Sequence, residues 1–372
     1  MINPNYEKLA KIVVKYSLEV EEGHKVVIVG PAFAKELFQA LSIEILKAGA
    51  HPVYISGIEG MREIFFKYAS EEQLLFVDSI EKAMYQDFDR FIQILGNYNT
   101  RRFSDVKPDK LANYADAPER RDLNALFDKK SARGEIKWVI VPFPCQADAQ
   151  EANMDLFSYT EFINRSLFLD KEDPIGEWRK IQKNHESIIE FLEKIENIQI
   201  IGEDTDLTIG VKNRKWINSS GQQNLPDGEI ATSPIEDGTN GHIRFTYPGI
   251  YFGKEIEDIY LEFKNGKAIK ATANKGEDLL KEILKIENAN RIGEFAIGTN
   301  YGIKKFTKNM LFDEKIGGTI HCALGTGFEE CGSENISSIH WDILKDVKLP
   351  GSKLIADGKV FYEEGKWQIN KS

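Results

Sequence analysis

The feature that most constrains the fold is a pair of short apolar segments separated by one amphipathic stretch. Lys25–Gly30 is rich in β-branched residues and ends at a glycine, and His51–Ile55 forms a second apolar run. Between them, residues 34–48 carry apolar side chains at helical spacing and are followed by Gly49. A strand, a helix and a strand in this order predict a βαβ unit and therefore a parallel sheet.

Further segments extend this pattern along the N-terminal half of the chain. The sequence predicts strands at Arg90–Leu95 and Lys137–Val141, and helices at residues 155–168 and 174–194. We therefore expect residues 1–190 to form an α/β N-terminal domain with a doubly wound parallel sheet. No glycine-rich phosphate loop follows the first strand, which leaves nucleotide binding with little support.

The pattern changes after residue 190, where short predicted strands alternate with polar turns. Asn265-Gly266 follows one such strand and is typical of a hairpin turn. A helix is predicted at Leu279–Ile286. We expect residues 191–372 to form an α+β C-terminal domain, and a chain of 372 residues is long enough for two domains.

Composition narrows the classes of function. The formal net charge of −11 excludes a domain-wide basic surface, so we expect no nucleic-acid partner. No apolar run is long enough to span a membrane, and the first residues lack the apolar core of a signal peptide. The three cysteines show no CxxC spacing, which favours a reducing compartment. We expect a cytoplasmic protein without a membrane partner.

A histidine and an aspartate stand two residues apart in the C-terminal half. Residues i and i+2 of a strand point to the same face, so His340 and Asp342 could bind one metal ion while Trp341 points away. His321, one of only six histidines in the chain, lies a short way upstream. Cys322 follows it directly, but strand neighbours point to opposite faces, so we expect Cys322 to be a small buried residue.

Three glutamates stand in settings that suggest the same chemistry. Glu294 is the only charge between Ile292 and Asn300, Glu229 follows a Pro-Asp-Gly turn, and Glu314 lies in an Asp-Glu-Lys triplet. A charge in an apolar setting is costly unless it is paired or coordinated. Two histidines with several carboxylates suit Zn²⁺, Co²⁺ or Mn²⁺, and they exceed what one catalytic zinc uses. A pair of ions bridged by a carboxylate would use the whole set.

Each of these residues also has an ordinary interpretation. A glutamate beside a turn is usually a solvated cap, and a lone histidine is more often a hydrogen-bonded core residue. Asp313 and Glu314 beside Lys315 would normally form a solvated charge cluster. On the residues alone, a metal site and these ordinary interpretations are equally well supported.

Five of these segments resemble the aminopeptidase T / aminopeptidase S family of metallopeptidases. The similarity extends over nearly the whole chain and is strongest in the C-terminal half. The matching segments follow the family's order with similar spacing, and they are Pro226–Glu229, Gly293-Glu294 with Gly298–Asn300, Leu311–Glu314, Thr319–His321 with Ala323–Gly325, and Ile339–Asp342.

The resemblance implies a site for two divalent ions, which we expect to be Zn²⁺, Co²⁺ or Mn²⁺, with Glu294 as the bridging carboxylate. The implied ligands are Glu229, Glu294, Glu314, His321, His340 and Asp342. It also implies an aminopeptidase that releases N-terminal amino acids from short peptides with a free N-terminus, by attack of a metal-activated water. Family members form dimers, so we expect a homodimer.

One position departs from the family. The family commonly has a tyrosine seven residues after the first histidine, where it is thought to assist catalysis, and this chain has Phe328. Phenylalanine has no hydroxyl to donate to an oxyanion. Tyr301 and Tyr247 are possible replacements, although each is more typical of a packing residue. Positive charge could come from Lys304, Lys315 or Arg244.

Two other functions stay open at this point. Two histidines and one carboxylate also form the site of mononuclear non-haem Fe(II) enzymes, and some ring-cleaving dioxygenases resemble this fold. That hypothesis leaves the three glutamates unexplained. A non-catalytic peptide-binding homologue is the second alternative, and Phe328 is its main support.

Overall fold

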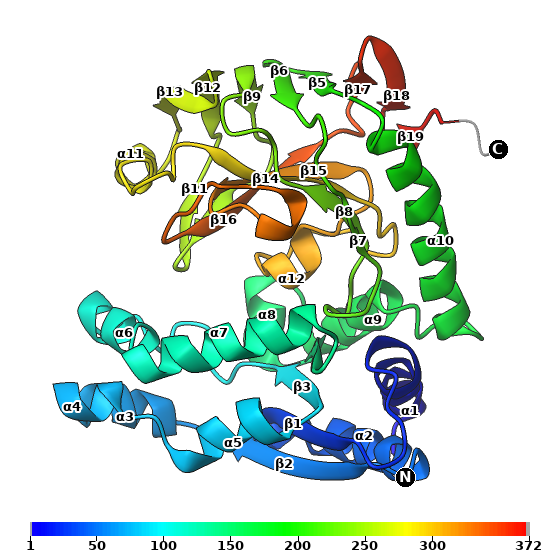
Figure 1. The fold of residues 1–372 in the computed structure, drawn as a ribbon, viewed down its shortest axis with the longest axis vertical. Helices are drawn as coiled ribbons and strands as arrows, with labels where there is room; N and C mark the ends of the chain where they lie inside the picture. The colour runs from blue at the N-terminus through cyan, green and yellow to red at the C-terminus, as the bar shows by residue number, and fades with distance from the viewer. Residues whose placement is uncertain (1, 370–372) are drawn as a thin grey trace. The chain divides into compact units, whose positions relative to one another are not determined.

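Four parallel strands form the sheet predicted for the N-terminal part (Figure 1). They lie in the order β2-β1-β3-β4, and each neighbouring pair is parallel. Their bounds are β1 (Lys25–Pro31), β2 (His51–Gly57), β3 (Arg90–Leu95) and β4 (Lys137–Pro142). The structure is a computed structural model and describes residues 2–369. The prediction of a parallel sheet in this part of the chain is confirmed.

Burial explains why the first two strands take different places in the sheet. β1 is central, and Val26, Val27 and Ile28 are buried on both of its faces, as in the interior of a parallel sheet. β2 is an edge strand, and most of its residues are exposed. The connecting helix α2 (Lys35–Lys47) buries Leu37, Leu41 and Ile45, which lie on one helical face, and Gly49 with φ +76° follows its C-cap.

The remaining helices of this part are mostly short. The predicted helix at 155–168 is present as α9, whereas α3 to α7 are not among the predicted elements. The bounds are α1 (Pro4–Ile12), α3 (Met61–Tyr68), α4 (Glu71–Leu75), α5 (Ser79–Asp87), α6 (Pro108–Ala115), α7 (Pro118–Ala132), α8 (Gln146–Glu151) and α9 (Leu156–Ser166). No helix within residues 2–369 is long and apolar enough to cross a membrane.

The chain divides into two compact units. The first runs to Ile175 and also contains Gly221–Pro226, and the second contains Gly176–Ser220 and the chain from Asp227 onward. The returning segment joins the first unit through β4, because Ile140 donates to Gln223 O and accepts from Leu225 N. The predicted boundary near residue 190 lies inside α10 (Pro174–Leu192).

The second unit is built on antiparallel sheets. An eight-stranded sheet has the order β13-β12-β9-β6-β5-β17-β18-β19, and a five-stranded sheet has the order β16-β15-β14-β8-β7. β10 and β11 form a separate pair, and the unit also contains most of α10, together with α11 and α12. As predicted, Asn265-Gly266 forms a hairpin turn, between β12 and β13.

The strands of this unit are β5 (Asn197–Gly202), β6 (Thr205–Gly210), β7 (Ile217–Ser219), β8 (Glu229–Thr232), β9 (Asn240–Arg244), β10 (Gly249–Tyr251), β11 (Lys254–Ile256), β12 (Tyr260–Lys264), β13 (Lys267–Thr272), β14 (Ile292–Gly298), β15 (Thr319–Gly325), β16 (His340–Asp346), β17 (Lys353–Ala356), β18 (Lys359–Glu363) and β19 (Lys366–Trp367). The short helices are α11 (Glu277–Ile283) and α12 (Met310–Asp313).

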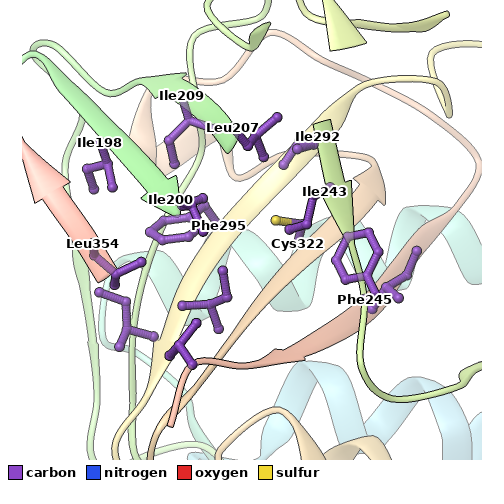
Figure 2. Packing of buried hydrophobic residues seen from close by; sticks show 14 of the residues in the cluster. Ile198, Ile200, Leu207, Ile209, Ile243, Phe245, Ile292, Phe295, Cys322 and Leu354 are labelled. Carbon is purple, nitrogen blue, oxygen red and sulfur yellow. The ribbon is translucent and has the colours of Figure 1, made fainter. Parts of the chain in front are cut away.

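A single apolar core joins the two large sheets of this unit (Figure 2). Ile200 and Leu207 enter it from the eight-stranded sheet, and Phe295 and Cys322 enter it from the five-stranded sheet. All four side chains are fully buried. Cys322 is therefore the small buried residue that its place in the strand predicts. Because side chains alternate along a strand, this packing directs the neighbouring residues Glu294 and His321 to the opposite face of the sheet.

Candidate metal centre

Five of the six predicted ligands lie on one face of four adjacent strands, β16-β15-β14-β8. The strand register brings them side by side, because Ala323 pairs with both Glu294 and Asp342 and Gly298 pairs with Glu229. The small side chain of Ala323 leaves room between the two carboxylates that flank it. Strand pairing thus collects residues that are far apart in sequence.

The sixth residue, Glu314, reaches the same place from a helix. It is the C-cap of α12, a four-residue helix whose N-cap Asn309 accepts a hydrogen bond from Leu311 N. Thr307 holds the helix from the other side, since its backbone N–H and its hydroxyl both donate to Asp313. A short capped helix therefore sets the position of Glu314.

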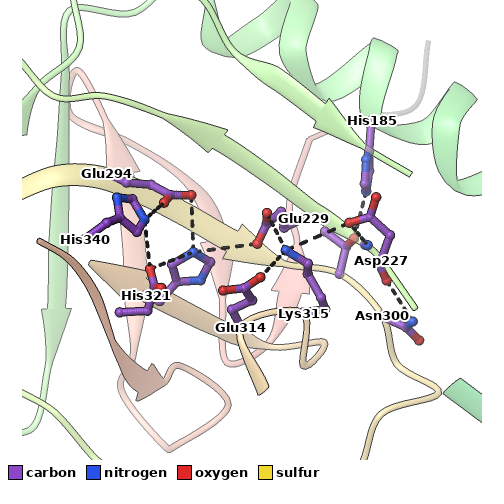
Figure 3. A network of polar contacts seen from close by, with 12 residues as sticks. His185, Asp227, Glu229, Glu294, Asn300, Glu314, Lys315, His321 and His340 are labelled. Atoms are coloured by element: carbon purple, nitrogen blue, oxygen red, sulfur yellow. Dashed lines mark hydrogen bonds and ion pairs between the residues drawn. The ribbon is translucent and has the colours of Figure 1, made fainter. Parts of the chain in front are cut away.

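The ligand atoms of the six residues lie close together (Figure 3). His340 Nε2 is 2.8 Å from Glu294 Oε2, and His321 Nε2 is 3.4 Å from Glu294 Oε1. His321 Nε2 is also 3.6 Å from Glu229 Oε2 and 3.9 Å from Asp342 Oδ1. Glu294 therefore faces a different histidine with each of its oxygens.

The six residues form three overlapping groups that could each hold an ion, and in each group the ligand atoms lie within 4.8 Å of one another. Glu294 belongs to two of the groups, and so do His321 and Asp342. The groups are Glu229 with Glu294 and His321, Glu294 with His340 and Asp342, and Glu314 with His321 and Asp342. The structure thus brings together every residue predicted to bind metal.

Burial and charge act against each other at these residues. Burial raises the pKa of Glu229 to about 8, although Lys315 lowers it. Burial alone would lower the pKa of both histidines, yet the surrounding carboxylates raise that of His321 to about 9 and that of His340 to about 11. Burial would raise the pKa of Glu294, but the two histidines hold it well below its usual range. The carboxylates of the cluster thus strongly favour positive charge beside them.

Two buried oxygens show that the residues fit a metal ion. Glu229 Oε2 and Asp342 Oδ1 have no hydrogen-bond partner among the described residues. The histidine nitrogens His340 Nε2 and His321 Nε2 are 3.6 and 3.9 Å from Asp342 Oδ1, which is too long for a hydrogen bond. Leaving a buried polar atom unpaired costs about 1–3 kcal/mol, and more for a charged group. A cation would remove this cost, and two imidazoles with four carboxylates suit Zn²⁺, Co²⁺ or Mn²⁺.

The orientation of His340 is set by its second ring nitrogen. His340 Nδ1 lies 2.8 Å from Thr326 O, which can only accept, so Nδ1 carries a proton. Its Nε2 is therefore the nitrogen that faces Glu294. A histidine ligand whose other nitrogen donates to a carbonyl is typical of protein metal sites.

His185, which is buried like His321, has a different role. Its ring nitrogens contact neutral groups, with Nδ1 2.9 Å from Asn218 Oδ1 and Nε2 2.7 Å from Thr299 Oγ1. Burial lowers the pKa of His185 to about 4, so the ring is neutral. His185 therefore ties α10 to two neighbouring segments of the second unit.

Lys315 is the residue of the cluster that the sequence did not single out. Its side chain is 1% exposed, and its ammonium lies 2.6 Å from Glu229 Oε1 and 2.5 Å from Glu314 Oε1. Burial alone would lower the pKa of Lys315, but the neighbouring carboxylates hold it well above its usual value. The interpretation of Asp313, Glu314 and Lys315 as a solvated cluster is wrong. In the sequence, the apolar neighbours Phe312 and Ile316 were the signal that this segment is buried.

The structure places Phe328 beside the cluster, with its ring centroid 5.6 Å from that of His340. The two tyrosines considered as replacements for the family's hydroxyl are engaged elsewhere. Tyr301 donates to Gly365 O at 2.9 Å, and the hydroxyl of Tyr247 lies 3.5 Å from Asp346 Oδ2.

Three residues could supply positive charge to the site, and one of them, Arg244, lies apart from the cluster. Its guanidinium pairs with Asp204 and Asp258. Lys304 is exposed. Only Lys315 contacts the predicted ligands.

Known proteins match the chain over almost its whole length. Aminopeptidase 2 of Geobacillus stearothermophilus is 26% identical over 408 residues, covering 97% of each chain. Aminopeptidase T of Thermus aquaticus is 24% identical over 414 residues, covering 98% of each chain. The structure of wild-type AmpT from Thermus thermophilus has the same fold, with a TM-score of 0.84 at 22% identity, and the match covers 98% of this chain and 99% of that one.

The family model described as thermophilic metalloprotease (M29) matches residues 2–367. This match spans both units and all six residues of the cluster. The resemblance seen in the sequence is thereby confirmed, and the chain belongs to the thermophilic metalloprotease family M29.

Proposed function

We propose that this metalloprotease is an aminopeptidase whose cluster binds two divalent ions and which acts on short peptides with a free N-terminus. The observation that carries the proposal is the convergence of six potential ligands in three overlapping groups. The proposed ligands are Glu229, Glu294, Glu314, His321, His340 and Asp342. The relatives named above, which are aminopeptidases, support this class of substrate.

Burial within the cluster indicates where substrate approaches. The side chain of His340 is 32% exposed, whereas Glu294 is 4% and His321 is 1% exposed. A peptide would therefore reach the centre from the side of His340, where Phe328 provides an apolar wall.

The residues of the chain have distinct tasks in this proposal. When bound, two divalent ions would polarise the scissile carbonyl and lower the pKa of a shared water. Glu294 offers its two oxygens on different sides, as a bridging carboxylate must. Thr326 keeps His340 Nε2 turned toward Glu294. Burial of Glu229 and His321 excludes bulk water from the inner side of the cluster.

The alternative of a mononuclear iron dioxygenase would use only the two histidines and one carboxylate of the cluster. An iron site of two histidines and one carboxylate would leave Glu229, Glu314 and their contacts with Lys315 without a role. The hypothesis of a non-catalytic homologue rests on Phe328 alone, and the activity assay below decides it.

The test combines metal analysis with an activity assay. Protein purified without chelator should contain two ions per chain, measured by mass spectrometry of the elements. With Zn²⁺ or Co²⁺ it should release amino acids from free aminoacyl anilides and leave N-acetylated anilides intact. One ion per chain, or no release alongside an active control enzyme, would refute the proposal.

We also propose a homodimer formed through the first unit. The edge strand β2 exposes Val53 and Tyr54, and further large apolar side chains are exposed nearby in sequence. An exposed strand edge with apolar side chains is a ready site for pairing with a second chain. The other residues are Ile43, Leu46, Ile58, Met61, Ile64, Phe65 and Tyr68.

Sedimentation tests the dimer and should give twice the chain mass, and Val53→Lys should give monomers. A wild-type monomer would contradict the proposal.

A cytoplasmic location is the remaining part of the proposal. Cys145, Cys322 and Cys331 are all buried and unpaired, as expected in a reducing compartment. Fractionation of the producing cells tests this, and recovery of the protein outside the cytoplasm would contradict it.

A further inference from the structure

Lys315 contacts two of the proposed ligands with one buried ammonium group (Figure 3). Glu229 begins β8 and Glu314 caps α12, so the ammonium joins carboxylates from two separate elements. Its contacts are to Oε1 of each glutamate, at 2.6 and 2.5 Å. An ammonium donates through three N–H groups and accepts nothing, so each contact fixes an oxygen of a carboxylate.

Hydrogen bonds of Asn300 hold the backbone that carries Lys315 close to the turn before Glu229. Asn300 N donates to Lys315 O at 3.0 Å, and Asn300 Nδ2 donates to Asp227 O at 2.8 Å. Asn300 thus ties the segment of Lys315 to the turn before Glu229. Gly228 in this turn has φ +121°, and a Cβ there would lie 2.8 Å from Asn300 Cβ, so the approach requires glycine.

The two oxygens of Glu229 have different partners. Oε1 is held by Lys315, whereas Oε2 lies 3.6 Å from His321 Nε2 and has no hydrogen bond. Only Oε2 is therefore available to a metal ion without breaking a short ion pair. Glu314 has one oxygen held in the same way. A carboxylate that gives both oxygens to an ion fills one more coordination position, and a catalytic metal needs an open position.

We propose that Lys315 is a positioning residue that keeps Glu229 and Glu314 as one-oxygen ligands, so that a coordination position stays open for water and peptide. The proposal rests on the proposed function, because it concerns the same metal centre. Two divalent ions would neutralise the charge of the four ligand carboxylates, and Lys315 has a separate partner in Asp227, whose Oδ1 is 4.0 Å away. Orientation of the glutamates, rather than neutralisation, is thus the role left for Lys315.

The test uses the Co²⁺-loaded protein and the variant Lys315→Met. We expect the variant to bind two ions, to show weaker visible absorption of Co²⁺ because the coordination number rises, and to lose kcat by about 10- to 100-fold with little change in KM. Lys315→Arg, which can donate to both carboxylates, should recover part of the absorption and of kcat.

Lys345 provides the matched control, because it is a second fully buried lysine of the same unit. It lies 2.8 Å from Arg244 O and 3.3 Å from Glu203 O and so contacts backbone carbonyls. Lys345→Met should change neither the Co²⁺ absorption nor kcat. If Lys315→Met does not fold, as judged by circular dichroism, Lys315→Gln takes its place, since its amide cannot hold both glutamates as an ammonium does.

The outcomes separate this proposal from the proposed function. An unchanged Co²⁺ spectrum and unchanged kcat in the Lys315 variant would overturn the positioning role. The same changes in Lys345→Met would also overturn it, because they would then follow from loss of any buried lysine. Wild-type protein that binds fewer than two ions or cleaves no peptide would refute the proposed function itself.

Discussion

At the scale of single residues, the cluster is defined by buried charges that compensate one another. Four carboxylates and two imidazoles meet in one cluster, and the ammonium of Lys315 contacts two of the carboxylates. Each ionised group in such a setting is stable only beside its partners. Removing one partner leaves another buried charge uncompensated, so single substitutions here should lower both metal binding and stability.

The first residue prediction concerns Glu294, which faces both histidines. Glu294→Gln replaces one oxygen by an amide that cannot coordinate in the same way, so kcat/KM should fall by about 10³-fold or more and metal content should drop. Glu282→Gln, on the exposed face of α11, is the control and should behave as wild type. Full activity and two ions in Glu294→Gln would exclude the bridging role.

The second residue prediction concerns Phe328. Phe328→Tyr adds a hydroxyl on the side of His340 from which substrate is proposed to approach, and donors to a developing oxyanion contribute 10²–10³-fold in optimised sites. We expect kcat to rise by about tenfold, because the surroundings have not been optimised for the hydroxyl. Phe252→Tyr, at a phenylalanine that is 86% exposed, controls for the added hydroxyl. An unchanged or lower kcat in Phe328→Tyr would show that a hydroxyl at this position does not help.

At the scale of elements, the β15–β16 connection links the packing of the unit to the cluster. This loop carries Phe328 and Thr326, and Glu236 anchors it by accepting from Glu334 N at 2.8 Å and Ser333 Oγ at 3.1 Å. Arg214 holds the other oxygen of Glu236 at 2.7 Å. One carboxylate outside the cluster thus helps to hold the loop that orients His340.

The element prediction is that Glu236→Ala loosens this loop. Loss of the anchoring hydrogen bonds should lower the free energy of unfolding by about 1–3 kcal/mol and reduce kcat/KM, measured by urea unfolding and steady-state kinetics. Glu334→Gln is the control, because Glu334 takes part in this anchor through its backbone N–H. Equal stability and activity of Glu236→Ala and wild type would contradict the anchoring role.

The same anchor predicts a pH dependence. Burial would raise the pKa of Glu236, but hydrogen bonds from Glu334 N and Ser333 and the charge of Arg214 lower it below its ordinary value. A lowered folded-state pKa contributes stability above the unfolded pKa of about 4.3, and the contribution disappears as pH falls through the folded value. The stability difference between wild type and Glu236→Ala should therefore shrink on acidification below that pH. A constant difference in urea titrations would contradict this.

At the scale of the whole molecule, the cluster lies on one face of the five-stranded sheet, and the opposite face packs into the core shared with the eight-stranded sheet. The core side chains of β14 and β15 are fully buried, so the ligands on the other face cannot move without disturbing the packing. Metal binding and folding of this unit should therefore be coupled.

The prediction at this scale is that chelation lowers thermal stability. A ligand that binds only the native state adds about 2.7 kcal/mol at a free concentration of 100 times its Kd. Dialysis against a chelator should lower the unfolding temperature and abolish peptidase activity, and added Co²⁺ should restore both. Unchanged thermal unfolding after verified metal removal would contradict the coupling.

Local patterns were enough to predict several parts of this protein. The β-branched segment Lys25–Gly30 predicted a central parallel strand, because burial on both faces requires apolar residues throughout. Alternation predicted that His340 and Asp342 share a face and that Cys322 enters the core. The motif order in the C-terminal half indicated the family, which the match over residues 2–367 confirms.

Other features became visible only in the folded chain. The side chains of Lys315 and Glu229 are in contact although 86 positions separate them, and a triplet such as Asp313-Glu314-Lys315 would ordinarily be a solvated cluster. Glu236 meets Glu334 across 98 positions to anchor the loop. Periodicity reports which face a side chain takes within its own element, whereas the partners that compensate a buried charge come from other elements. The sequence thus determined the first parallel strands and that His340 and Asp342 share a face, and the tertiary structure decided which other ligands join them and what surrounds the cluster.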